Sequence, residues 1–188
     1  MSDDRARWDA KHRADAHSAP ADPDPWIASV LESMLEDRPA PGRALDLACG
    51  RGRHALVLAR RGFAVEGWDV SPVALRLLRD AARREGLEVA TRLVDLARGL
   101  PQDAPRFDLV LVVRFLDRKL YPELHRLIAP GGELLLTTFT RDWPKASPSA
   151  RFRLARGELA EGLPGLETVA YEERGGLARL RSRAPGVN

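Results

Sequence analysis

The sequence contains a single cysteine, few aromatic residues and no long hydrophobic run. One cysteine among 188 residues permits no internal disulfide, which fits a reducing compartment. No stretch approaches the roughly 20 apolar residues of a membrane-spanning helix. The polar start at Met1–Asp4 also lacks the apolar core of a signal peptide. We therefore expect a cytoplasmic protein with no membrane partner.

An excess of charge of one sign is also missing. Lys and Arg number 30 against 27 Asp and Glu, so the net charge is only +3. Such weak electrostatics give no reason to expect a nucleic-acid partner. His12, His17 and His125 do not stand at metal-ligand spacing with other ligand types, so we expect no metal site. A chain of 188 residues that is 44% hydrophobic is expected to form a single domain, residues 1–188.

The most informative segment of the chain is a glycine-containing turn that follows an apolar strand. The sequence Asp46-Leu47-Ala48-Cys49-Gly50-Arg51-Gly52-Arg53 comes directly after Ala44-Leu45. Gly50 and Gly52 lack Cβ atoms where a strand must turn sharply into a helix and a ligand must approach the backbone. A second strand, Ala64–Trp68, then ends at Asp69. A carboxylate at that end of a parallel strand can bind both ribose hydroxyls, which predicts a nucleoside site.

Two cofactor classes fit the pattern Gly50-x-Gly52-x-x-Ala55, dinucleotides and S-adenosylmethionine (SAM). Asp46 favours SAM, because a carboxylate beside a pyrophosphate is unfavourable whereas the ammonium and sulfonium of SAM attract it. A third acid, Asp95, follows the apolar run Val89–Leu93 and can accept a hydrogen bond from an adenine amino group.

The rest of the chain alternates strand and helix patterns, which indicates a parallel sheet. Residues 1–24 are polar and are expected to cover the domain as a lid, and residues 25–183 form the core. We expect helices at Trp26–Leu35, from Ser71-Pro72 to Gly86, at Glu123–Ile128 and near Glu158–Leu163, and strands at Leu109–Val113, Glu133–Phe139, Glu167–Tyr171 and Leu177–Arg183. Arg179, Arg181 and Arg183 share one strand face, interpreted as the solvent side.

Several of these segments resemble the class I SAM-dependent methyltransferases, and most of all the small bacterial tellurite-resistance and thiopurine types. The resemblance covers roughly residues 5–183. It is carried by residues 45–53, 61–65, 69–71 and 107–110, by Ala129-Pro130-Gly131-Gly132, and by Arg7-Trp8-Asp9. Ala48 departs from the pattern, since many relatives have glycine there.

The resemblance implies an α/β, Rossmann-like class I methyltransferase fold. This fold has a mostly parallel seven-stranded sheet, a C-terminal antiparallel hairpin and helices on both faces. It also implies SAM as the cofactor. The expected cofactor-binding residues are Asp46, Ala48, Gly50, Gly52, Asp69, Val70, Asp95 and Leu96.

Methyl transfer from a sulfonium is a direct displacement, so the residues expected around the acceptor position it and no catalytic residue is assigned. The candidates are Arg7, Trp8, Arg114 and Trp143, with Arg151 and Phe152 as further parts of a lid. Each is also explained as a packing anchor or a solvated arginine. Cys49 is interpreted as a small turn residue rather than a nucleophile.

A small-molecule acceptor, such as a thiol or a metalloid oxyanion, is favoured because strand Leu109–Val113 is not followed by an Asn/Asp-Pro-Pro-aromatic loop. Two other functions remain open. One is a SAM-binding protein without turnover that acts as a sensor or partner subunit. The other is an NAD(P)-dependent reductase, which Asp46 and the lack of a Tyr-x-x-x-Lys pair disfavour. Both a monomer and a homodimer are compatible with the sequence.

Overall fold

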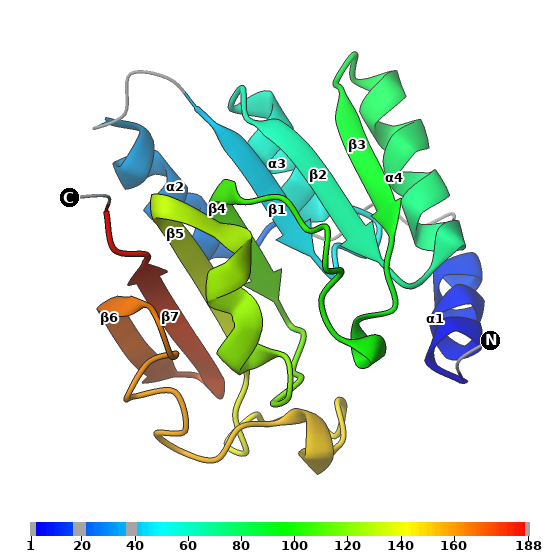
Figure 1. The fold of residues 1–188 in the computed structure, drawn as a ribbon. Helices are drawn as coiled ribbons and strands as arrows, with labels where there is room; N and C mark the ends of the chain where they lie inside the picture. The colour runs from blue at the N-terminus through cyan, green and yellow to red at the C-terminus, as the bar shows by residue number, and fades with distance from the viewer. Residues whose placement is uncertain (1–2, 17–21, 37–40, 187–188) are drawn as a thin grey trace. The chain divides into compact units, whose positions relative to one another are not determined.

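The computed structural model describes residues 3–16, 22–36 and 41–186, so His17 and part of the expected lid lie outside the described residues. Two compact units, Met1–Leu96 and Ala97–Asn188, divide the chain. The strands form a seven-stranded sheet in the order β3-β2-β1-β4-β5-β7-β6 (Figure 1). Among the strand pairs described in the next paragraphs, the antiparallel ones involve the C-terminal hairpin and the others are parallel. This arrangement confirms the predicted Rossmann-like fold. None of the helices in the described ranges combines the length and apolar character of a membrane span.

The first unit contains three parallel strands with helices packed against them. Its elements are α1 (Asp3–Ala14), α2 (Pro25–Glu36), β1 (Arg43–Leu47), α3 (Arg53–Arg60), β2 (Ala64–Asp69), α4 (Pro72–Arg84) and β3 (Val89–Leu93). β2 pairs in parallel with both β1 and β3. α3 and α4 both contact β2, and α1 packs against α4 (Figure 1).

Helix α4 begins and ends where its sequence predicts. The Ser71 side chain accepts a hydrogen bond from the backbone N–H of Ala74, and Pro72 occupies the first helical turn, where a missing N–H costs nothing. Beyond the helix, Gly86 adopts a left-handed φ of 67°. Because both ends of α4 are fixed locally, its start directly after β2 is also fixed.

The second unit contains a parallel strand pair and an antiparallel hairpin. Its elements are β4 (Phe107–Val113), η2 (Tyr121–Leu127), β5 (Ile128–Phe139), η3 (Ala150–Phe152), β6 (Glu167–Arg174) and β7 (Leu177–Arg183), with η1 (Leu96–Arg98) at the boundary. β4 pairs in parallel with β5, and β7 runs antiparallel to both β5 and β6. β4 is buried almost throughout, as its continuous apolar run predicts.

The largest differences between prediction and structure in the second unit concern three elements. The helix expected at Glu123–Ile128 is the 3₁₀ helix η2, a form common in short segments. β5 begins at Ile128 rather than Glu133, because Ile128 already pairs with Phe107 of β4 before a shift in register. The helix expected at 158–163 is a series of turns, interrupted by left-handed glycines at 157 and 162.

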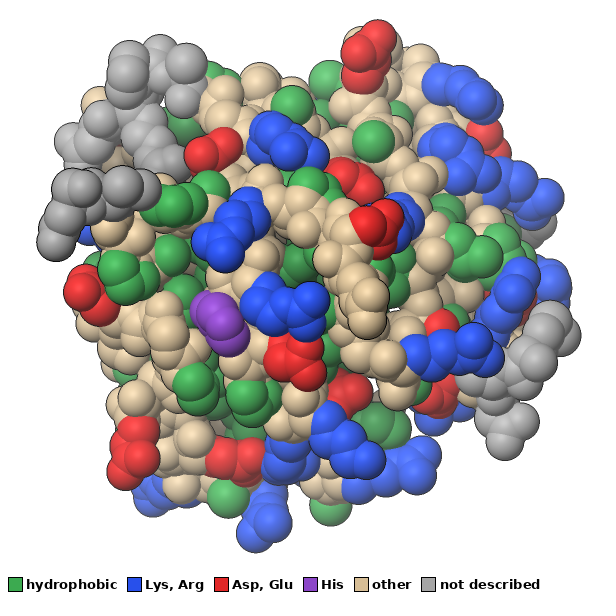
Figure 2. Space-filling model, viewed as in Figure 1, with side chains coloured by type: hydrophobic (Ala, Val, Ile, Leu, Met, Phe, Trp, Pro, Cys, Tyr) green, Lys and Arg blue, Asp and Glu red, His purple; other side chains and the backbone are tan. Residues whose placement is uncertain are grey.

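The arginines of β7 are not simply solvated. Arg181 and Arg183 both donate hydrogen bonds to the carboxylate of Glu133, whose side chain is only 2% exposed. Burial by itself would raise the pKa of Glu133, but these hydrogen bonds outweigh it and lower the pKa. Arg179 pairs in turn with Glu172. Acidic and basic side chains are likewise interspersed on the face shown in Figure 2.

The turn of the C-terminal hairpin lies close to the backbone of Trp143, and substitutions in the turn test that contact. Gly175 and Gly176 both have left-handed φ, 61° and 77°. A Cβ at Gly176 would lie 2.4 Å from the Cα of Trp143, whereas nothing lies within 4 Å of one at Gly175. We expect Gly176→Ala to lower the free energy of unfolding by about 3 kcal/mol, from strain plus a backbone clash.

Gly175→Ala is the matched control and is expected to cost only about 1 kcal/mol, since it carries the left-handed penalty alone. Urea unfolding of both variants measures the difference. Equal destabilisation of the two would contradict the close approach of Gly176 to Trp143.

Candidate functional site

Asp69, the last residue of β2, bridges the glycine loop and the start of α4. Its Oδ2 accepts a hydrogen bond from the backbone N–H of Gly50 at 2.8 Å, and its Oδ1 accepts one from the N–H of Ser71 at 2.9 Å. The loop itself turns through left-handed residues, with φ values of 55° at Ala48, 54° at Gly50 and 80° at Gly52. Ala48 therefore adopts a conformation that costs a non-glycine residue about 1–2 kcal/mol.

Asp46 lies one residue before the end of β1 and is buried. Its Oδ2 accepts the N–H of Ala55 at 3.0 Å, in the first turn of α3. Burial raises the pKa of Asp46 to about 7, and burial also raises the pKa of Asp69. The two carboxylates interact unfavourably with each other, so each would be stabilised by a nearby positive charge.

The two glycines of the loop serve different purposes. A Cβ at Gly52 would lie 2.1 Å from Leu78, and the N–H of Gly52 donates to the carbonyl of Cys49. Gly52 is therefore needed for packing against α4 inside the unit. A Cβ at Gly50 would meet only His12, at 3.5 Å. Gly50 is thus the glycine of the loop that faces α1.

Helix α1 lies over this loop through three contacts. Ser71 donates a hydrogen bond to the buried carboxylate of Asp9, and Arg51 donates to the carbonyl of Asp15. His12 faces Gly50 and interacts electrostatically with Asp69. Burial lowers the pKa of His12, which keeps its ring neutral near pH 7.

The other residues predicted in the first unit lie either on α1 or just beyond the ends of β2 and β3. Trp8 stacks on His12 with ring centroids 5.8 Å apart, whereas Arg7 is exposed and pairs with Asp4. Val70 and Asp95 are half-buried and Leu96 is buried, just beyond β2 and β3. Because the N–H of Val94 donates to the carbonyl of Asp69, the segment after β3 stays beside the end of β2. The structure therefore brings Asp46, Ala48, Gly50, Asp69, Val70, Asp95 and Leu96 to the same edge.

In the second unit, Arg114 and Trp143 are joined by a residue that sequence reasoning missed. Arg114 follows β4 with a left-handed φ of 57°, and its N–H donates to the carbonyl of Thr137 at 2.7 Å. Its guanidinium lies over the ring of Phe139, 5.8 Å from the centroid, and Phe139 contacts Trp143 at 4.8 Å. Backbone strain of this kind is concentrated at functional sites. Phe139 ends β5, and that position was the signal that could have identified it.

Two expectations about other chemistry can be compared with the structure. Burial raises the pKa of the Cys49 thiol well above its usual value, so the thiolate form is disfavoured. Over residues 3–16, 22–36 and 41–186, no group of three His, Cys, Asp or Glu side chains is arranged to hold a metal ion.

Comparison with known proteins finds a family that matches part of the chain. Residues 44–132 match the family described as methyltransferase domain. A probable S-adenosyl-L-methionine-dependent methyltransferase, TehB of Haemophilus influenzae, is 29% identical over 144 residues, covering 73% of this chain and 50% of that protein. Residues 44–132 belong to the methyltransferase domain family, and the chain is similar to the class I SAM-dependent methyltransferases.

One further relative agrees with the methyltransferase assignment, and one solved structure shares the fold. A ubiquinone biosynthesis O-methyltransferase of Alkalilimnicola ehrlichii is 38% identical over 109 residues, covering 55% of this chain and 44% of that enzyme. A structure concerning conversion of a disulfide bond into a thioacetal group during echinomycin biosynthesis aligns with a TM-score of 0.75 at 22% identity, covering 98% and 93% of the two chains. The chain spans about half the length of the curated relatives it matches.

The raised pKa of Asp46 predicts a pH dependence of stability. A carboxyl whose folded pKa is about 7, above its ordinary 3.8, stabilises the fold below pH 3.8, and that stability is lost as the pH rises toward 7. Asp46→Asn keeps an oxygen for the Ala55 N–H and removes the charge. We expect the variant to gain stability relative to the wild type between pH 4 and pH 8. Urea unfolding at both pH values tests this, and a difference that does not vary with pH would contradict the burial of an uncompensated charge.

Proposed function

We propose that the first unit binds SAM at the glycine loop and that the protein transfers its methyl group to a small molecule. The observation that carries the proposal is the pair of buried carboxylates, Asp46 and Asp69, that end β1 and β2 beside a left-handed loop. A dinucleotide would bring a pyrophosphate toward these acids, which is unfavourable. A sulfonium and an ammonium are favourable there.

The residues present fit the cofactor. Each Asp69 oxygen accepts one backbone N–H and retains a further lone pair, so the carboxylate can accept both ribose hydroxyls while it holds the loop. The half-buried backbone at Ala48 and Gly50 allows close approach of the methionine part. Asp95 can accept from the adenine amino group, with Val70 and Leu96 as apolar neighbours. The bound cofactor would supply an electrophilic methyl group.

On the acceptor side, the protein's contribution is orientation and exclusion of water rather than proton transfer. Thiols and oxyanions that are already ionised need no general base. The guanidinium of Arg114 would attract such an anion, and Phe139 and Trp143 would provide an apolar wall beside it. Trp8 and Arg7 of α1 stay predictions for acceptor binding, and the exposed position of Arg7 gives it the weaker support of the two.

Substitution of Asp69 tests the cofactor site. In Asp69→Asn only one side-chain oxygen remains to accept hydrogen bonds. The two backbone N–H groups and the ribose hydroxyls together need more acceptor positions than it offers. We expect SAM binding, measured by titration calorimetry, to weaken by about 2 kcal/mol, which is roughly 30-fold. Asp80→Asn, a change of the same kind at an exposed ion pair on α4, is the control and should leave the affinity unchanged. An unaltered affinity in Asp69→Asn would refute the ribose assignment.

Arg114 is tested by a variant that tolerates its backbone conformation. Asparagine adopts left-handed φ more readily than most residues, so Arg114→Asn removes the guanidinium with little added strain. Release of S-adenosylhomocysteine is measured against a panel of thiols, oxyanions and small phenols. We expect turnover to fall at least tenfold while SAM affinity is retained, and Arg114→Lys to recover part of the loss for anionic acceptors.

Two outcomes of this experiment would count against the proposal. Equal losses of turnover and cofactor affinity in Arg114→Asn would place Arg114 in the cofactor site. SAM binding by the wild type without turnover on any member of the panel would favour a binding protein that acts as a sensor or partner subunit.

A further inference from the structure

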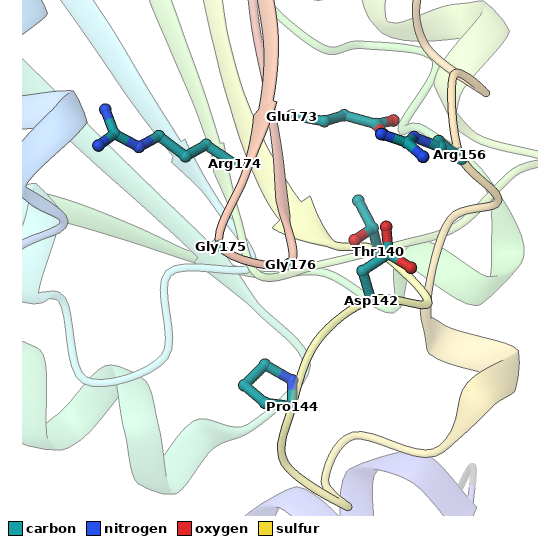
Figure 3. Close-up of a pocket in the computed structure, with 8 residues that line it drawn as sticks. All are labelled: Thr140, Asp142, Pro144, Arg156, Glu173, Arg174, Gly175 and Gly176. Carbon is teal, nitrogen blue, oxygen red and sulfur yellow. The ribbon is translucent and has the colours of Figure 1, made fainter.

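The second unit contains a polar pocket of about 430 Å³ near the carboxyl end of β5. Its lining comes from the start of the connection after β5, from Arg156, and from the end of the β6–β7 hairpin. The lining residues are Thr140, Asp142, Pro144, Arg156, Glu173, Arg174, Gly175 and Gly176 (Figure 3). This volume lies within the range of small-molecule sites. Ligands of open α/β sheets bind beyond the carboxyl ends of the strands, and β5 ends beside this pocket.

The walls of the pocket are held in place by hydrogen bonds that a ligand does not have to create. The N–H of Thr140 donates to the carbonyl of Gly176, which fastens the connection to the hairpin turn. The guanidinium of Arg153 donates to backbone carbonyls of the connection, including those of Trp143 and Pro148. The pocket is therefore pre-formed, although its connection has little regular secondary structure.

The charged side chains in the pocket are of both signs. One oxygen of the Glu173 carboxylate, Oε1, accepts hydrogen bonds from both the N–H of Gly157 and the hydroxyl of Tyr171. Asp142 and Arg156 differ from Glu173, because neither makes a hydrogen bond or an ion pair with any other described residue, including each other. In Figure 3 the side chains of Glu173 and Arg156 point toward one another, whereas the Arg174 side chain extends to the other side of the hairpin.

We propose that this pocket binds a small zwitterion of the amino-acid class. Its carboxylate is held by the guanidinium of Arg156 and its ammonium group by the carboxylate of Asp142. A ligand with both charges satisfies two groups that do not pair across the pocket, whereas a simple anion or cation leaves one of them uncompensated. The hydroxyl of Thr140 and the backbone of the Gly175-Gly176 turn line the space between. This site goes beyond the proposed function and does not depend on methyl transfer.

Three matched probes test the proposal by ligand-observed NMR titration of the full chain. L-Phenylalanine carries both charges, 3-phenylpropionate lacks the ammonium group, and 2-phenylethylamine lacks the carboxylate. We expect L-phenylalanine to bind about tenfold more tightly than either analogue. Arg156→Gln and Asp142→Asn should each lower its affinity about tenfold, the typical effect of losing one charged hydrogen bond.

Arg174→Gln is the control, because it removes the same charge from a side chain that extends away from Arg156. It should leave the affinity unchanged. Equal binding of L-phenylalanine and 3-phenylpropionate, or an effect of Arg174→Gln as large as that of Arg156→Gln, would overturn the proposal. A protein that binds S-adenosylhomocysteine but none of the probes would overturn this inference alone. Failure of the wild-type protein to bind S-adenosylhomocysteine would instead contradict the proposed function.

Discussion

The geometry of the first unit depends on one carboxylate, that of Asp69. It joins the N–H of Gly50 to the N–H of Ser71, so the glycine loop and the start of α4 share one hydrogen-bonding centre. Ser71 extends the connection, since its hydroxyl caps α4 and donates to Asp9 of α1. A single buried charge therefore fixes a loop, a helix start and a covering helix. Its burial raises its pKa, so a nearby positive charge would stabilise its ionised form.

The second unit relies on arginine in a comparable way. Arg153 organises the connection after β5 by donating to its carbonyls, and Arg181 and Arg183 neutralise the buried Glu133. The planar guanidinium suits these tasks because it offers several donors in fixed directions. The abundance of arginine in a chain of net charge +3 thus has a structural explanation at these positions. Arg114 stands apart because its left-handed backbone holds it beside Phe139.

Much of the fold could be predicted because its signals are local. Alternating apolar runs located the strands of the first unit almost to the residue, and Ser71-Pro72 gave the start of α4. Contacts between distant residues carry no such signal. The pairing of Glu133 with Arg181 and Arg183, the contact of Gly52 with Leu78 and the place of Phe139 beside Arg114 arise only when strands and helices meet. The sequence likewise predicted Asp69 as a ligand for ribose, which stays a prediction, but not as the acceptor of two backbone N–H groups.

The central claim is that buried carboxylates with raised pKa values hold a cationic sulfur nucleoside. The most direct test is calorimetric titration of the wild-type protein with SAM near pH 7, in two buffers of different ionisation enthalpy, beside a parallel titration with NAD(P). SAM should bind and release protons, because a positive charge lowers the pKa of Asp46 from about 7. Binding of NAD(P) in place of SAM, or SAM binding without proton release, would contradict the claim.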